Sequence, residues 1–139
     1  SLTYIENGVT LRTATELFLL KKRYTIVSII WGDCHVCMGK FKKWGSLLSE
    51  DHFDNTQVIL VVSTASIEHF MRIYFPMISY AGSIVVDTNE TFTSLNKLSA
   101  STIEYNTFLL DSSYSIKIVG DPLVFPELLS LYLEVVNEK

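Results

Sequence analysis

The chain has 139 residues, a length typical of one domain, and 48% of its residues are apolar while 19% are charged. This composition excludes a largely disordered chain, and the formal charge of -4 excludes a broad basic surface of the kind that binds nucleic acid. The longest apolar runs, 24–31 and 58–62, are far shorter than the roughly 20 residues that a membrane-spanning helix needs. We therefore expect a single domain over residues 1–139, with an N-terminal extension over about residues 1–22 and no nucleic-acid partner.

The first strand and helix of the domain are predicted around the two cysteines. Residues 13–22 predict a helix that leads into a strand over 24–31, whose β-branched and aromatic residues are typical of a strand covered on both faces of a parallel sheet. Apolar residues then recur every three or four positions, which predicts an amphipathic helix over about 34–49. Gly32 and Asp33 separate the strand from the helix, and Asp33 is the expected N-cap.

Basic residues gather only locally. One short run, Lys21 to Arg23, precedes the first strand, and Lys40, Lys42 and Lys43 follow the second cysteine. Because apolar residues fill the opposite helix face, we expect these lysines to be ordinary solvated surface.

A second strand and helix follow. The run over 57–62 predicts another buried strand, and Ser63 or Thr64 is the expected cap of a helix over about 65–74 that stops at Pro76. This second unit predicts a sheet with parallel strands at its centre.

The last third of the chain predicts shorter elements. A strand is expected over 83–87 and a short helix over 90–98, followed by a hairpin of strands 107–110 and 115–119 and a terminal helix around 128–135. Strands that alternate with helices before a hairpin and a closing helix indicate an α/β domain with a mixed sheet.

A Cys-x-x-Cys pair falls where the first strand meets its helix. The sulfurs of Cys34 and Cys37 are within reach of a disulfide, and such a pair next to a βαβ pattern is typical of redox chemistry. Unpaired N–H groups and the positive end of the helix dipole stabilise a thiolate at the first cysteine. We therefore expect Cys34 to be the nucleophile and Cys37, one turn further along, to resolve the mixed disulfide.

Asp33, His35 and Trp31 are candidate tuning or substrate-facing residues. His35 either stabilises a thiolate through an imidazolium or N–H donor, which makes the pair more oxidising, or is simply an exposed histidine. Asp33 acts in the opposite direction, because a carboxylate beside Cys34 disfavours a second negative charge unless it is engaged in capping. Trp31 either flanks the site or fills the core, and Trp44 is expected to fill the core.

Two other uses of the cysteines stay open at this stage. A bridge that closes so short a loop removes little chain entropy, so a purely structural disulfide is the weaker interpretation. Cys-x-x-Cys is also half of a zinc site, but His52 and His69 supply no second ligand pair at zinc spacing. We expect no metal site within one chain and no other cofactor, whereas a metal shared between two chains remains compatible with the spacing.

With its strand, turn, Cys-x-x-Cys helix start and Thr107-Phe-Leu-Leu-Asp111 strand, the chain resembles the thioredoxin superfamily over roughly residues 24–136. It looks closest to the TlpA-like and AhpC/TSA-like thiol-disulfide oxidoreductase domains. The resemblance implies a thioredoxin-like fold, in which a central mixed β-sheet is flanked by helices on both faces. It also implies that Cys34 is the nucleophile and Cys37 the resolving residue.

The chain departs from the family pattern at three places. Alignment on Thr-Phe-Leu puts Tyr105 where the family has a cis-proline, and because a non-proline cis bond costs about 2.5 to 4 kcal/mol, we expect a trans peptide and a different substrate groove. Trp31 stands where peroxiredoxins have a catalytic threonine, so we do not expect peroxidase activity. Residues 24–30 contain no carboxylate to accept the proton of the resolving thiol, a role that Glu104 or Asp33 would then have to fill.

The sequence therefore predicts a thiol-disulfide oxidoreductase, not a peroxidase, that acts on protein or peptide thiols and disulfides together with a redox partner protein. The resemblance implies the periplasm or cell envelope of a bacterium, with a membrane link only through a trimmed lipoprotein anchor. The alternative is a non-enzymatic thioredoxin-like binding module with a structural or vestigial disulfide. Tyr105 favours this alternative, and both cysteines at the helix start favour the enzyme. A metal-binding or metal-delivering domain is the third hypothesis.

Overall fold

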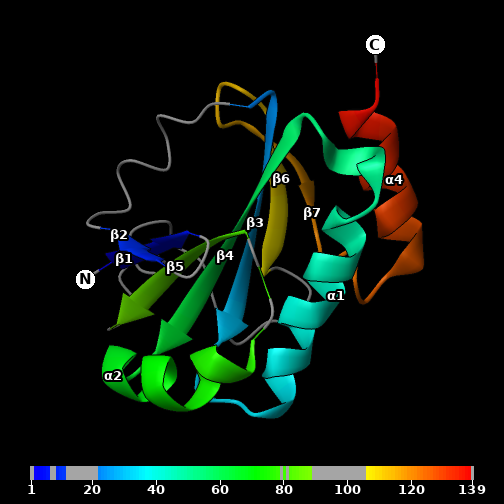
Figure 1. The fold of residues 1–139 in the computed structure, drawn as a ribbon. Coiled ribbons are helices and arrows are strands. Elements are labelled where there is room, and N and C mark those ends of the chain that lie inside the picture. The colour runs from blue at the N-terminus through cyan, green and yellow to red at the C-terminus, as the bar shows by residue number, and fades with distance from the viewer. Residues whose placement is uncertain are drawn as a thin grey trace.

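The computed structural model describes residues 2–6, 9–11, 22–78, 80, 82–88 and 106–138. The described strands form one seven-stranded sheet in the order β2-β1-β5-β4-β3-β6-β7 (Figure 1). The strands are β1 (Leu2–Glu6), β2 (Val9–Leu11), β3 (Tyr24–Trp31), β4 (Thr56–Thr64), β5 (Ser83–Thr88), β6 (Thr107–Leu110) and β7 (Ile116–Val119), and the helices are α1 (Gly39–Leu48), α2 (Ile67–His69) and α4 (Pro126–Val136). None of the described helices is long and apolar enough to cross a membrane.

Three parallel strands form the centre of the sheet. β3 pairs with β4 along its whole length, from Tyr24 opposite Thr56 to Trp31 opposite Ser63, and β4 pairs in parallel with β5. Every residue of β3 except Trp31 is buried, and such a strand needs apolar side chains on both faces rather than an alternating pattern. The strand predicted over 24–31 is therefore confirmed, and β4 extends the one predicted over 57–62 at both ends.

Antiparallel strands flank this centre on both sides. β6 pairs with β3 and β7 pairs with β6, which confirms the predicted hairpin. Its turn is held by the Asp111 carboxylate, which accepts the N–H groups of Ser113 and Ser115. The bond from Ser115 does most to lower the pKa of Asp111, with smaller contributions from Ser113 and Lys117. At the other edge β1 pairs with β5 and β2 with β1, so strands lie in the segment that the sequence analysis treated only as an extension.

The helix predicted over 34–49 begins one turn late and changes type. Residues Val36–Met38 form a 3₁₀ turn, and α1 continues from Gly39 to Leu48. The last helix is confirmed as α4, which begins with Pro126 at a first-turn position, where proline lacks only an N–H that would be unpaired anyway.

The helix predicted over 65–74 is divided into two short pieces, and a third piece continues past Pro76, where the helix was expected to stop. α2 is followed by a π-helical turn, Phe70–Tyr74, and by a 3₁₀ turn, Phe75–Met77. The cap is Ser66, which accepts the N–H of His69, and not Ser63 or Thr64, because both of those residues still belong to β4. The helices predicted over 13–22 and 90–98 lie outside the described residues.

The main hydrophobic core lies on the sheet face that is covered by α1, α4 and the π-helical turn (Figure 1). Its largest fully buried side chains include Trp44 and Phe41 of α1, Phe70 of the π-helical turn and Tyr132 of α4. Successive side chains of a strand point to opposite faces, so alternate residues of β3, such as Val27 and Ile29, form a smaller cluster on the other face. The expected mixed sheet flanked by helices is confirmed.

Gly32 is the point where the backbone leaving β3 packs most tightly. Its N–H donates to the carbonyl of Ser63 at 2.7 Å, which continues the β3–β4 ladder past the end of the strand. A Cβ atom at this position would lie 2.5 Å from Cγ1 of Val62 and 3.1 Å from Cβ of Thr64. Only glycine therefore lets the chain pass β4 at this distance.

We expect Gly32→Ala to lower the free energy of unfolding by about 1 to 3 kcal/mol, because the new methyl group forces backbone or side chains of β4 to move. Urea denaturation measures this change. Gly39→Ala is the control, since a Cβ there meets nothing within 4 Å and alanine is favoured over glycine in a helix by about 0.5 to 1 kcal/mol. Equal stability of the two variants would contradict the close approach at Gly32.

Candidate redox site

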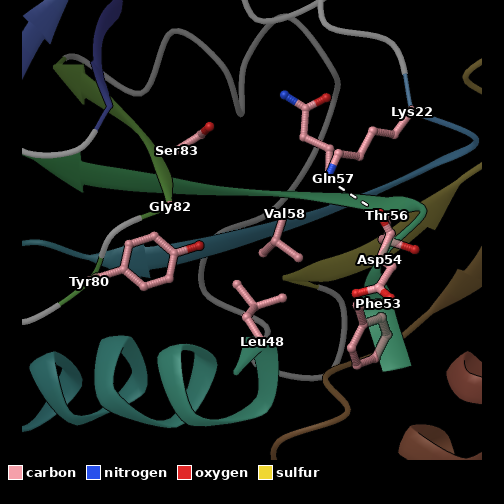
Figure 2. Close-up of a pocket in the computed structure, with 10 residues that line it drawn as sticks. All are labelled: Lys22, Leu48, Phe53, Asp54, Thr56, Gln57, Val58, Tyr80, Gly82 and Ser83. Atoms are coloured by element: carbon pink, nitrogen blue, oxygen red, sulfur yellow. Dashed lines mark hydrogen bonds between the residues drawn. The ribbon is translucent and has the colours of Figure 1, made fainter. Parts of the chain in front are cut away.

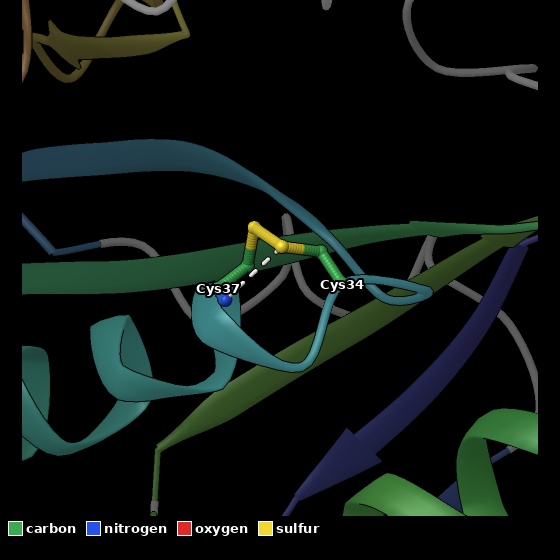
Figure 3. Close-up of a disulfide and its surroundings, with 2 residues drawn as sticks. All are labelled: Cys34 and Cys37. Carbon is green, nitrogen blue, oxygen red and sulfur yellow. Dashed lines mark hydrogen bonds between the residues drawn. A yellow bond between two sulfur atoms is a disulfide. The ribbon is translucent and has the colours of Figure 1, made fainter.

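A disulfide joins Cys34 to Cys37 just beyond the carboxyl end of β3, where the chain enters the helical segment (Figure 3). The two Cα atoms are 5.2 Å apart, within the usual range for a disulfide. Both residues are partly exposed. The carboxyl ends of parallel strands are where open α/β sheets place their binding sites, so the disulfide lies at the end of the sheet best suited to chemistry.

The helix start supplies the sulfur of Cys34 with a hydrogen-bond donor. The N–H of Cys37 points to Sγ of Cys34 at 3.2 Å, as well as to the carbonyl of Cys34 at 3.1 Å (Figure 3). The side chain of His35, the residue before this turn, makes no capping hydrogen bond, and the turn includes no acidic group. Sγ of Cys34 therefore occupies the position that a capping oxygen takes in other helices, at the positive end of the helix dipole.

Asp33 is not the N-cap that the sequence predicted. Its Oδ1 accepts the hydroxyl of Thr64 at 2.6 Å, and its Oδ2 accepts the N–H of Ala65 at 3.0 Å. The carboxylate is therefore turned away from the helix and toward the end of β4. Two hydrogen bonds now connect the loop that carries the cysteines to the loop that leads into α2.

His35 also contacts the α2 segment, through Tyr74. The ring centroids of His35 and Tyr74 are 6.4 Å apart, and those of His69 and Tyr74 are 5.7 Å apart. His35 and His69 are both exposed, whereas Tyr74 is partly buried. Tyr74 ends the π-helical turn, and such turns occur often at functional sites because the extra residue shifts the side chains that follow.

The two tryptophans have different environments. Trp44 has no exposed surface and packs in the main core, which confirms its expected role. Trp31 is 37% exposed at the end of β3, on the sheet face of Ile29, whereas Cys37 packs against the main core on the opposite face. Trp31 therefore stands at the rim of this end of the sheet and does not cover Cys37.

Buried polar residues, Asn106 and Thr107, stand at the start of β6, the strand that pairs with β3. The hydroxyls of Ser28 and Thr107 are 2.7 Å apart, and the carbonyl of Asn106 accepts the N–H of Ile29 at 2.8 Å. No cis peptide occurs among the described residues. Tyr105, the expected substitute for the cis-proline, and Glu104 lie outside the described residues.

A partly buried ion pair near the site was missed by the sequence analysis. Lys40, expected among the solvated lysines, has a side chain only 23% exposed, and its Nζ lies 3.3 Å from Oδ2 of the fully buried Asp121. Lys42 and Lys43 are exposed as expected. The spacing of Lys40 three positions after Cys37 was a usable signal, because it places this lysine on the cysteine side of the helix.

A cavity of about 360 Å³ lies at the other end of the sheet, between the start of β4, the start of β5 and the end of α1 (Figure 2). Tyr80 lines it, and burial holds the pKa of this phenol well above its usual value. Nζ of Lys22 donates to the carbonyl of Asp54 at 3.4 Å beside it. None of its lining residues is Cys or His, and no cluster of three or more metal-ligating side chains occurs in the described part of the chain.

No protein-family model and no curated protein matches the chain. Solved structures do match it. A Chlorobium tepidum protein assigned as the thiol:disulfide interchange protein DsbE has a TM-score of 0.71 at 13% identity, covering 97% of this chain and 92% of that one. The N-terminal domain of PilB from Neisseria gonorrhoeae has a TM-score of 0.64 at 15% identity, covering 91% and 83%. MTB DsbF, solved in mixed oxidised and reduced forms, has a TM-score of 0.64 at 11% identity, covering 86% and 84%. The chain has the thioredoxin-like fold that the sequence predicted.

The bonds of Asp33 predict measurable coupling between the cysteine loop and β4. In a double-mutant cycle of Asp33→Ala and Thr64→Val, we expect a coupling free energy of about 0.5 to 1.5 kcal/mol in urea unfolding, the usual net value of one hydrogen bond. A cycle of Asp33→Ala with Ser49→Ala, at the far end of α1, should be additive. Additivity in the first cycle within about 0.3 kcal/mol would show that the bond contributes nothing.

Proposed function

We propose that the protein is a thiol-disulfide oxidoreductase in which Cys34 is the nucleophile and Cys37 the resolving cysteine. The observation that carries the proposal is the hydrogen bond from the N–H of Cys37 to Sγ of Cys34 at the start of a helix. When the pair is reduced, the same N–H and the helix dipole stabilise a thiolate on Cys34, and the thiolate is the form that attacks disulfides.

Exchange with a client disulfide then proceeds in two steps. The Cys34 thiolate attacks one client sulfur, which forms a mixed disulfide and releases the other client sulfur as a thiolate that takes up a proton. Cys37 loses its proton and attacks Sγ of Cys34, which forms the Cys34–Cys37 bond and releases the second client thiolate. The client gains two electrons and the pair loses them. The pair gives up the Cys37 proton, and the two client thiolates take up two protons, the second of them from solvent. The reverse sequence oxidises a client dithiol.

The surroundings of the pair support protein or peptide clients. Val36, between the cysteines, is 86% exposed, and Ile73 and Met77 on the neighbouring turns are 43% and 59% exposed. These exposed apolar side chains belong to the cysteine turn and to the segment whose Tyr74 contacts His35, so we propose that this surface receives the client chain. A redox partner protein would restore the starting state of the pair after each exchange.

Two neighbours of the pair receive proposed roles. We assign His35 to thiolate stabilisation from its place between the cysteines, and the contact with Tyr74 limits where its ring can move. Asp33 opposes the thiolate less than the sequence implied, because its carboxylate is engaged by Thr64 and Ala65. Tyr105 is the residue we propose beside the client chain, on the family alignment.

An oxidising compartment suits this chemistry, because disulfides persist in the bacterial envelope and in secreted proteins and are rare in the reducing cytosol. We propose the periplasm or cell envelope on this ground and on the resemblance to thioredoxin-like envelope proteins. Two structural neighbours, the thiol:disulfide interchange protein DsbE and DsbF, support the same chemistry.

The second candidate is a binding module with a structural disulfide. It is favoured by one specific feature, the tyrosine at position 105 in place of the proline that receives substrate backbone in the family. The two functions differ in what the disulfide does at equilibrium, so the reduction potential separates them.

We expect the Cys34–Cys37 pair to have a reduction potential between about -120 and -270 mV in glutathione or dithiothreitol buffers, the range of working exchange proteins. When the reduced Cys37→Ser variant is mixed with test proteins that contain disulfides, it should trap them as mixed disulfides through Cys34, because the resolving step is lost. Cys34→Ser is the matched control. It should trap far less, since Cys37 lies one turn into the helix and not at its start.

A potential below about -300 mV together with no trapping by Cys37→Ser would mark the bond as structural. The binding-module function would then replace the proposed one.

A further inference from the structure

The Lys40–Asp121 ion pair lies one helical turn beyond the disulfide and takes no part in the exchange steps above. Oδ2 of Asp121 lies 3.3 Å from Nζ of Lys40, and its Oδ1 accepts the N–H of Leu123 at 2.9 Å. The carboxylate is therefore fixed in the turn between β7 and α4. Lys40 follows Cys37 by three positions, and residues at this helical spacing have Cβ atoms about 5 to 6 Å apart.

The turn that carries Asp121 lies at the same end of the sheet as the cysteines. The N–H of Gly120 donates to the carbonyl of Thr107 at 2.8 Å, and Thr107 is paired with Ser28 in the second half of β3. Cys37 and Tyr132 both belong to the main core on this face, and the Tyr132 hydroxyl donates to the carbonyl of Gly120 at 2.7 Å. A charge on Asp121 is thus placed in the same apolar region that Cys37 packs against.

The charge of Asp121 changes the pKa of a residue packed in this region, Tyr132. Burial does most to raise the pKa of the Tyr132 phenol, and the negative charge of Asp121 raises it further. Water screens such a charge strongly at the surface and only weakly in the interior. Because Cys37 packs against the same core, we expect a thiolate at the helix start to respond to this charge as well.

A stabilising role alone does not account for this pair. The cost of removing both charges from water offsets most of their attraction, so a buried ion pair adds little net stability. The described polar side chains of β3 and β6 that face the main core, Ser28 and Thr107, are uncharged and bonded to each other. Along α1, the charged side chain nearest to Cys37 in sequence is Lys40. The negative charge of Asp121 balances the positive charge of this lysine.

We propose that the Lys40–Asp121 pair sets the reduction potential of the Cys34–Cys37 couple, with Asp121 as a positioning residue that fixes Lys40 and balances its charge. This inference rests on the proposed thiol-disulfide function. Reduction of the disulfide by two electrons and one proton leaves one thiol and one thiolate, and nearby net positive charge stabilises this thiolate whereas net negative charge destabilises it. Removing one partner of the pair therefore shifts the redox equilibrium in a direction that depends on which partner is removed.

The test is the equilibrium of the pair with dithiothreitol. Asp121→Asn leaves the lysine charge unbalanced and should favour the dithiol by about three- to tenfold, where tenfold equals about 30 mV. Lys40→Met leaves the carboxylate unbalanced and should favour the disulfide by a similar factor. Lys40→Arg should restore the wild-type value within about twofold, and the uncharged double variant K40M/D121N should lie close to it.

Lys42→Met is the matched control, because Lys42 is an exposed lysine on the same helix, and it should change the equilibrium less than twofold. Shifts of the two single variants in the same direction, or shifts no larger than that of Lys42→Met, would overturn the proposal. A merely structural pair would lower the free energy of unfolding in both variants without opposite redox shifts. Dithiothreitol needs no client protein, so this result stays separate from the trapping test of the proposed function.

Discussion

The close passage of Gly32 along β4 is the constraint on which the rest of the site depends. A side chain there would collide with Val62, so the turn from β3 into the helical segment needs glycine at this point. Its N–H extends the ladder to Ser63, and the next residue, Asp33, is bonded to Thr64 and Ala65. The loop that carries the cysteines is therefore fixed to the rigid centre of the sheet before the first cysteine is reached.

The position of the loop at Gly32 and Asp33 determines which charged and hydrogen-bonding groups surround the cysteine pair. The first turn contains no acidic residue, the carboxylate of Asp33 is bonded to Thr64 and Ala65, and the N–H of Cys37 donates to Sγ of Cys34. In the proposed exchange, the mixed disulfide is resolved by Cys37, which packs against the main core, and Lys40 three positions further along is paired with Asp121. In the proposed mechanism the backbone at the helix start activates Cys34, and the Lys40–Asp121 pair sets the reduction potential of the couple.

Much of this arrangement was predictable from the sequence because it depends on local patterns. The β-branched run of β3, the change to a helical period and the Cys-x-x-Cys spacing specify the strand, the helix and the place of the disulfide. Sequence also indicated Trp44 as a core residue, since it lies on the apolar face of the helix.

The features that the sequence did not predict depend on contacts between residues that are distant in sequence. A side chain that can cap its own helix can also bond a neighbouring strand, and the position of Thr64 decided which bond Asp33 makes. Lys40 resembles the surface lysines beside it until Asp121, 81 positions further on, is brought against α1. The short strands β1 and β2 gave no pattern of their own, because their pairing with β5 rather than their composition makes them strands.

The reactivity of the reduced protein toward iodoacetamide, followed from pH 4 to pH 10 with the modified cysteine mapped by mass spectrometry, tests the central claim most directly. We predict that Cys34 is alkylated first and that its rate rises through a midpoint well below about 8.5, the ordinary thiol pKa, while Cys37 reacts slowly. Equal alkylation of the two cysteines with a midpoint at or above that value would show that the helix start does not activate Cys34, and would contradict the account.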